Sequence, residues 1–268
     1  MVKKLIKYES TAYARTMLPM LIIVLGIGLL TRFVQFFENG SDAYSIVNVS
    51  SIVALVISII VAIVMTVFVG ITRFYKNLFT NEGYLSFTLP VTPSGHIFAK
   101  LIVAVLFEIV TLLTCAASAA IACAGDLLHE IIKAANYLMN GYFKSLGGHG
   151  AFYIVEAIIL LLCASVAKYL LFYACISVGQ LANKNRVLLA FGVFFGYYFA
   201  MQILGTIFII VADSCFDALT DEISCFASNH PFAFVHCMMW ILIASEIVAA
   251  LIYYFVSRYI IKRRLNLE

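Results

Sequence analysis

The chain has 268 residues, of which 64% are hydrophobic and only 12% are charged, and its formal net charge is +3 at pH 7. Ordinary soluble domains carry about 25% charged residues and about 45–50% apolar residues. The composition therefore excludes an ordinary soluble domain and predicts a membrane protein, and we expect no nucleic-acid partner.

Six apolar stretches, each long enough to cross a bilayer with about 20 residues, follow one another along the chain. Backbone polar groups in lipid must be satisfied within the segment, and none of the stretches alternates as a barrel strand would. We therefore expect an all-α polytopic membrane protein with a single transmembrane domain over residues 1–268. The first stretch is of full span length, so no cleavable signal peptide is expected. The predicted spans are 16–37, 50–72, 97–124, 151–178, 187–212 and 235–257.

The distribution of positive charge predicts the orientation of these spans. Thirteen of the 17 Lys and Arg residues flank the spans on one side, whereas only Lys133 and Lys144 fall in the opposite connections. Because positively charged flanks stay in the cytoplasm, both termini are expected to be cytoplasmic, in a multi-pass protein of the cell membrane. The thirteen residues are Lys3, Lys4, Lys7, Arg15, Arg73, Lys76, Lys100, Lys184, Arg186, Arg258, Lys262, Arg263 and Arg264.

The connection over 125–150 is expected on the outer side as an amphipathic helix. It is read either as a structural lid over the exit route or as a ligand-binding element. Its apolar residues recur at helical spacing opposite Glu130, Lys133 and Asn136; they are Leu127, Leu128, Ile131, Ile132, Ala135, Leu138 and Met139.

Motifs for catalysis, cofactors and metals are missing from the sequence. No GxxxxGK[ST] phosphate loop and no GxSxG turn occur, so any ATP chemistry must belong to a partner chain. The HEIIK stretch at 129–133 places Lys133 where a zinc protease needs its second histidine. Five of the seven cysteines lie in spans, and the remaining pair, Cys215 and Cys225, could form a disulfide or lie apart. We expect no catalytic residue, no metal and no cofactor.

Between the second and third spans lies NEGYLSFTLPVTPSGH, residues 81–96. Gly83 is a natural helix stop, and Pro90 and Pro93 set an extended or turned path. This pattern predicts a short, stiff cytoplasmic projection with an apolar tip. Physical reasoning alone leaves two interpretations, a loop that re-enters the bilayer interface and a docking element.

The stretch EGYLSFTLPVTPSGHIFAK resembles the cytoplasmic segment of bacterial ABC transporter permeases of the ABC-2 class, and KYESTAYARTMLPM, residues 7–20, is similar to the amphipathic helix that leads into their first span. The resemblance implies a coupling helix region over 73–96 and short outer helices over 213–234. It also implies an ATP-driven exporter of an amphipathic lipid, peptide or drug, with two cytoplasmic ATPase subunits and a second permease copy or related permease in the membrane. The ATPase-docking residues would be Glu82, Gly83, Tyr84, Leu85, Leu89 and Pro90.

Among the ionisable residues inside the predicted spans, where charge is costly in lipid, three share one depth. Glu108, Lys168 and Glu246 each lie about 15–16 Å from the cytoplasmic end of their span, at a rise of about 1.5 Å per residue. Two interpretations remain open, a Glu108–Lys168 pair that fixes helix packing and a polar translocation or gating path.

Two other classes of function stay open from sequence alone. A secondary transporter or channel that is not coupled to ATP would have similar spans, although no convincing internal repeat relates the two halves. An intramembrane enzyme would need a reactive group and its base, which the sequence does not show.

Overall fold

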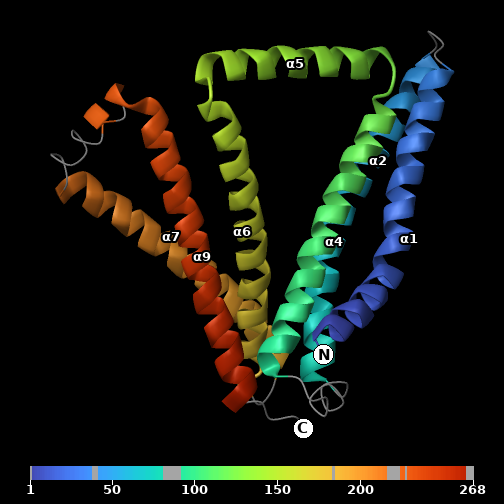
Figure 1. The fold of residues 1–268 in the computed structure, drawn as a ribbon. Helices are drawn as coiled ribbons and strands as arrows, with labels where there is room; N and C mark the ends of the chain where they lie inside the picture. Colours follow the sequence, from blue (N-terminus) through green and yellow to red (C-terminus); the bar gives the residue numbers. More distant parts are fainter. Residues whose placement is uncertain are drawn as a thin grey trace. The chain divides into compact units, whose positions relative to one another are not determined.

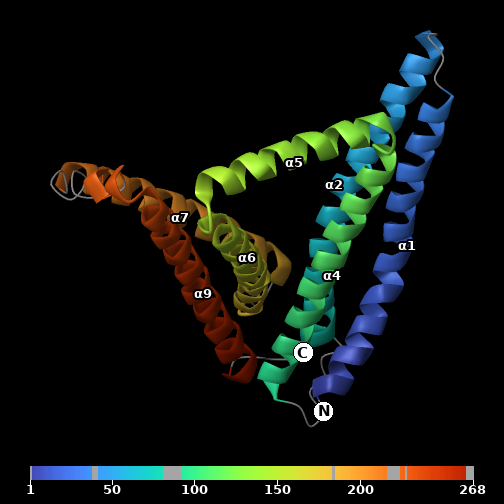
Figure 2. The same ribbon diagram turned by 45° about the horizontal axis from the view of Figure 1, so that its top comes forward.

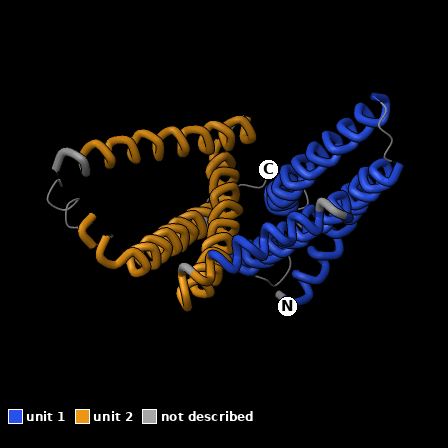
Figure 3. Tube along the Cα trace, turned by 90° about the horizontal axis from the view of Figure 1, so that it is seen from above, with its two compact units in different colours: residues 1–141 blue, residues 142–268 orange. Residues whose placement is uncertain are grey.

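The protein is an all-α polytopic membrane protein, and the part of the chain that the structure describes contains six helices long and apolar enough to cross a bilayer. The computed structural model describes residues 2–37, 42–80, 92–182, 185–215, 224–226 and 228–263. Figure 1 shows these helices coloured along the chain, and Figure 2 shows them from a second angle. They divide into two compact units, residues 1–141 and 142–268, which Figure 3 colours separately.

Unit 1 is built from three long helices that pack against one another: α1 (Val2–Phe36), α2 (Asp42–Phe79) and α4 (Pro93–Ala122). At about 1.5 Å per residue the 35 residues of α1 extend about 52 Å, well beyond a hydrocarbon core of about 30 Å. The amphipathic helix expected over 7–20 and the first span are thus one continuous helix. Pro19 lies inside it, and the helix bends in its N-terminal half because proline removes a backbone hydrogen bond.

Close approach of the backbones holds α1 against α4. Gly28 of α1 faces Ser118 of α4 so closely that an added Cβ would lie 2.8 Å from the Ser118 carbonyl oxygen. Glycine is therefore required at this contact by space alone. The Ser118 hydroxyl donates a 2.8 Å hydrogen bond to the carbonyl oxygen of Val24, one turn away on α1.

The start of α4 is set by local sequence. Thr92 is extended and its hydroxyl accepts a hydrogen bond from the backbone N–H of Gly95 at 3.4 Å, as expected of an N-cap residue. Pro93 occupies the first helical position, where its missing N–H is not needed. Pro93, the second of the two prolines predicted to shape the turn before the third span, is therefore the first residue of α4.

The predicted amphipathic segment over 125–150 contains the helix α5 (Asp126–Leu146). Gly125, with φ 115°, comes directly before it and permits a backbone turn that other residues rarely adopt. An added Cβ at Gly125 would lie 3.0 Å from a guanidinium nitrogen of Arg32. The Arg32 side chain therefore packs against the α4–α5 turn.

Unit 2 is organised around α6 (His149–Gly179), which packs against both α7 (Arg186–Cys215) and α9 (Pro231–Arg263). Gly179 and Ala190 bring α6 and α7 together, since an added Cβ at Gly179 would lie 2.7 Å from the Ala190 Cβ. Phe172 stacks on Phe194 across the same helices at 5.1 Å between ring centroids. Of the outer helices expected over 213–234, residues 216–223 and 227 lie outside the described residues. Residues 213–215 end α7, short helical pieces cover 224–226 and 228–229, and α9 begins at Pro231.

Candidate functional site

The docking segment expected at Glu82, Gly83, Tyr84, Leu85, Leu89 and Pro90 lies outside the described residues. Its two flanks are described: α2 ends at Phe79, and α4 begins at Pro93. The candidate docking site is therefore described through the side chains that anchor the end of α2 and the start of α4.

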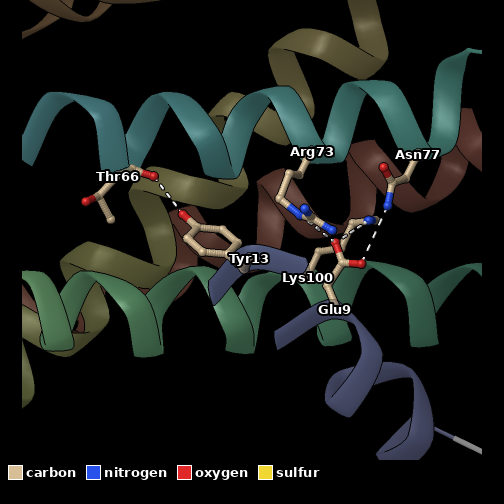
Figure 4. Close-up of polar contacts among 6 residues, drawn as sticks. All are labelled: Glu9, Tyr13, Thr66, Arg73, Asn77 and Lys100. Atoms are coloured by element: carbon tan, nitrogen blue, oxygen red, sulfur yellow. Dashed lines mark hydrogen bonds and ion pairs between the residues drawn. The ribbon is translucent and has the colours of Figure 1, made fainter. Parts of the chain in front are cut away.

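A charged cluster joins both flanks to α1, and we call it the Glu9 cluster (Figure 4). The carboxylate of Glu9 accepts a 2.7 Å hydrogen bond from Nζ of Lys100, in the first turns of α4. It also accepts from Nε of Arg73 at 3.4 Å and from Nδ2 of Asn77 at 3.5 Å, both in the last turns of α2. One carboxylate thus connects three helices at the end of unit 1 from which residues 81–91 emerge.

Burial makes the ion pairs of this cluster costly to break. The side chains of Glu9 and Lys100 are only 10% and 7% exposed, and that of Arg73 is 21% exposed. Removing one partner from a buried ion pair commonly costs about 3–5 kcal/mol because the other charge stays buried. The cluster therefore fixes the relative positions of the three helix ends.

The Glu9 cluster was not predicted from the sequence. Arg73 and Lys100 were read only as flanking positive charges, and Glu9 was part of a quoted resemblance without a role of its own. One signal was present: Glu9 is an acidic residue within a run of basic ones, between Lys7 and Arg15.

A second polar layer lies farther along the same three helices. The hydroxyl of Tyr13 donates a 2.7 Å hydrogen bond to the carbonyl oxygen of Thr66, and the hydroxyls of Thr66 and Thr111 lie 2.9 Å apart. Tyr13 is 2% exposed and stacks on Phe107 at 4.6 Å between ring centroids. Together with the Glu9 cluster this layer ties α1, α2 and α4 into one body (Figure 4).

The three charges predicted inside the spans are divided between the units. Glu108 lies on α4 in unit 1, whereas Lys168 lies on α6 and Glu246 on α9 in unit 2. The pairing of Glu108 with Lys168 therefore stays a prediction.

Lys168 and Glu246 line the same cavity in unit 2, which has a volume of about 380 Å³. The phenols of Tyr197 on α7 and Tyr253 on α9 also line it, and their hydroxyls are hydrogen-bonded to each other. Nζ of Lys168 lies 5.2 Å from the ring centroid of Tyr169, within the range of a cation–π contact. The structure thus places a cation, an anion and two phenols around one cavity inside predicted spans.

A second cluster in unit 2 joins the N-terminal ends of α6 and α9. Nδ1 of His236 lies 2.8 Å from Oε1 and 2.9 Å from Oε2 of Glu156, which is only 7% exposed. Nε2 of His236 lies 3.2 Å from Nδ1 of His149, and the His236 ring stacks on Tyr153. An apolar cavity of about 370 Å³ lies beside it, lined by Tyr153, Phe232 and neighbouring side chains. The contacts fasten α6 to α9.

No arrangement for metal binding is found among the described side chains, in which no three or more His, Cys, Asp or Glu residues are grouped to hold an ion. Cys225 is a free, exposed thiol, and the side chain of Cys215 lies outside the described residues.

Comparison with known proteins identifies no relative of this chain. No family model matches it, and no curated protein or solved structure matches it either.

Proposed function

We propose that this chain is the membrane-spanning permease subunit of an ATP-driven exporter, and that the segment 82–90 docks onto a separate cytoplasmic ATPase subunit. In this proposal two ATPase subunits and a second permease, identical or related, complete the transporter. The termini are cytoplasmic, and the cargo is amphipathic. The chain has no phosphate-binding loop of its own, so nucleotide chemistry is left to the partner.

The observation that carries the proposal is the Glu9 cluster. A docking segment is useful only if its displacement reaches the spans, and a flexible attachment would absorb that displacement. Arg73 and Lys100, on the two sides of the segment, bond to one buried carboxylate on α1. Any push on the segment then moves α1, α2 and α4 together, which is the mechanical property that a coupling element needs.

Exposed apolar surface supports a membrane partner for unit 2. The most apolar window of α7 has no buried residue within the described structure. Lipid or a second permease must cover this surface, and the proposed assembly provides both.

Docking and coupling can be tested separately with two sets of variants. Tyr84→Ala and Leu85→Ala remove apolar anchors of the segment, and loss of a central anchor commonly costs about 2 kcal/mol or more, roughly thirtyfold in affinity. Glu9→Gln leaves the docking residues intact and removes the charge that holds the two flanks of the segment to α1. Co-purification of the ATPase encoded in the same operon and its ATPase rate in nanodiscs are measured for each variant.

We expect Tyr84→Ala and Leu85→Ala to lose ATPase binding while remaining folded. Glu9→Gln should keep binding, but ATP turnover should no longer be coupled to transport. Leu128→Ala on α5 is the matched control and should change neither property. Full binding and coupled transport in both Tyr84 and Leu85 variants would reject the docking proposal.

The alternative is a secondary transporter or channel that needs no ATPase. The opposite charges of Lys168 and Glu246 around one cavity favour it, because ionisable residues inside spans often mark ion pathways. Reconstituted transport driven by an ion gradient without ATP would select this alternative.

A further inference from the structure

The cavity in unit 2 has opposite charges on two different helices. Lys168 is contributed by α6 and Glu246 by α9, and both side chains are half-buried. Ionisable side chains inside a span commonly mark a substrate or ion site. A volume of about 380 Å³ lies within the range of about 300–1,000 Å³ that is typical of small-molecule sites.

The remaining walls of the cavity give it room and hydrogen-bonding groups. Ala164 and Ala167 on α6 and Ala249 on α9 line it with small side chains, which leave the space open. The hydroxyls of Tyr197 and Tyr253 are bonded to each other beside the charges, and a hydroxyl can both donate and accept. The wall is thus polar where the charges lie, and it is formed in part by small side chains elsewhere.

From this arrangement we propose that the cavity binds a zwitterionic group, with its anionic part at Lys168 and its cationic part at Glu246. A ligand that carries both charges gains from both walls. A ligand with a single charge meets a like charge on one wall, and such repulsion is an effective source of specificity. The volume fits a headgroup rather than a whole lipid, so the acyl chains of a lipid ligand would remain outside.

We assign the zwitterionic ligand to a lipid, because the surface next to the cavity is apolar and exposed. Tyr198 and Met201 of α7, which themselves line the cavity, are 53% and 50% exposed. Acyl chains can lie along this face of α7 while the headgroup occupies the cavity. The idea that such a lipid is the exported substrate rests on the proposed function. Its binding in the cavity does not.

Headgroup preference of the purified full-length chain tests the proposal. Thermal unfolding in maltoside detergent is followed while lipids with identical acyl chains and phosphocholine, phosphoglycerol or trimethylammonium headgroups are added. A ligand that binds the folded state raises the unfolding temperature by an amount that increases with its concentration relative to its Kd. We expect the phosphocholine lipid to bind about tenfold or more tightly than the other two.

Two variants should change the preference in opposite directions. Glu246→Gln leaves a cationic cavity and should favour the phosphoglycerol lipid, whereas Lys168→Gln should favour the trimethylammonium lipid. Lys133→Gln, on the exposed face of α5, is the matched control and should behave as wild type. The charge-reversed double variant Lys168→Glu with Glu246→Lys keeps both charges and should keep the phosphocholine preference, and it replaces the single variants if these do not fold.

Equal shifts for the three headgroups, or an unchanged preference in both single variants, would overturn the proposal, as would loss of the preference in the folded double variant. A parallel titration with soluble phosphocholine distinguishes the sources. Binding of the lipid alone supports the lipid assignment, and equally tight binding of the soluble compound supports a free zwitterion in the same site. Neither titration needs the ATPase, so failure here and failure of docking are separate results.

Discussion

Glu9 and Lys100, 91 positions apart in the sequence, form a buried ion pair whose Oε1–Nζ distance is 2.7 Å. The pair joins the first helix of unit 1 to the start of α4, directly after the segment that we propose to dock onto an ATPase. Both side chains are shielded from solvent, so removal of either charge should destabilise the protein.

Glu9→Gln should lower the free energy of unfolding by about 3–5 kcal/mol, because it removes the anion that pairs with the buried Lys100. Lys100→Met should lower it by less, because Glu9 keeps its contacts with Arg73 and Asn77. The double variant should lose much less than the sum of the two. Thermal or denaturant unfolding of the purified protein in detergent gives the three values. Lys7→Gln, at an exposed position of the same helix, is the control. Strictly additive losses would show that the two residues do not interact.

Tyr13→Phe should destabilise unit 1 by about 1–2 kcal/mol, since the buried carbonyl oxygen of Thr66 loses its side-chain donor while the ring packing is kept. Tyr8→Phe is the matched control because Tyr8 is 72% exposed on the same helix. Equal unfolding temperatures for the two variants would contradict the assigned hydrogen bond.

Gly28→Ala should cost about 1–3 kcal/mol, the usual range for overpacking, because its Cβ would lie 2.8 Å from the backbone oxygen of Ser118. Gly26→Ala, half a turn away, meets nothing within 4 Å and should be neutral or stabilise by up to about 1 kcal/mol through helix propensity. Stability changes of opposite sign in the two variants would show that α1 approaches α4 closely at Gly28 but not at Gly26. A stabilising Gly28→Ala would reject this packing.

His236→Leu should destabilise unit 2 by about 1–3 kcal/mol, because the buried carboxylate of Glu156 would lose the imidazole that faces it at 2.8 Å. Adding Glu156→Gln to this variant should recover part of the loss by removing the charge. Unfolding temperatures of the single and double variants decide the point. His129→Gln, at an exposed position of α5, controls for loss of an imidazole.

Labelling of single cysteines tests the proposed orientation. Asn77 contacts Glu9, so the neighbouring exposed position Lys76 is the better site near the end of α2. With the other cysteines removed, Lys76→Cys should react with an impermeant reagent only from the cytoplasmic side. Ser228→Cys should react only from outside, because positive charge gathers on the inner side. Reaction of both from one side would contradict the six-span topology.

Hydropathy and span length determined the fold class from the sequence, and both are properties of a contiguous segment. The predicted span 97–124 compares with α4 over Pro93–Ala122, and 151–178 compares with α6 over His149–Gly179. The amphipathic spacing of residues around Glu130 and Lys133 likewise lies within the helix α5. No partner from elsewhere in the chain is needed for such predictions, since a lipid-embedded backbone satisfies its hydrogen bonds locally.

Tertiary structure alone decided which side chains meet. The sequence marked Lys168 and Glu246 as charges at one depth, but their common cavity depends on how α6 and α9 are rotated about their axes. Likewise, nothing local to Glu9 indicates that Lys100 is its partner rather than one of the other flanking cations. Hydropathy carries no information on helix rotation or neighbour choice, because these follow from close packing between helices such as the Gly28–Ser118 contact.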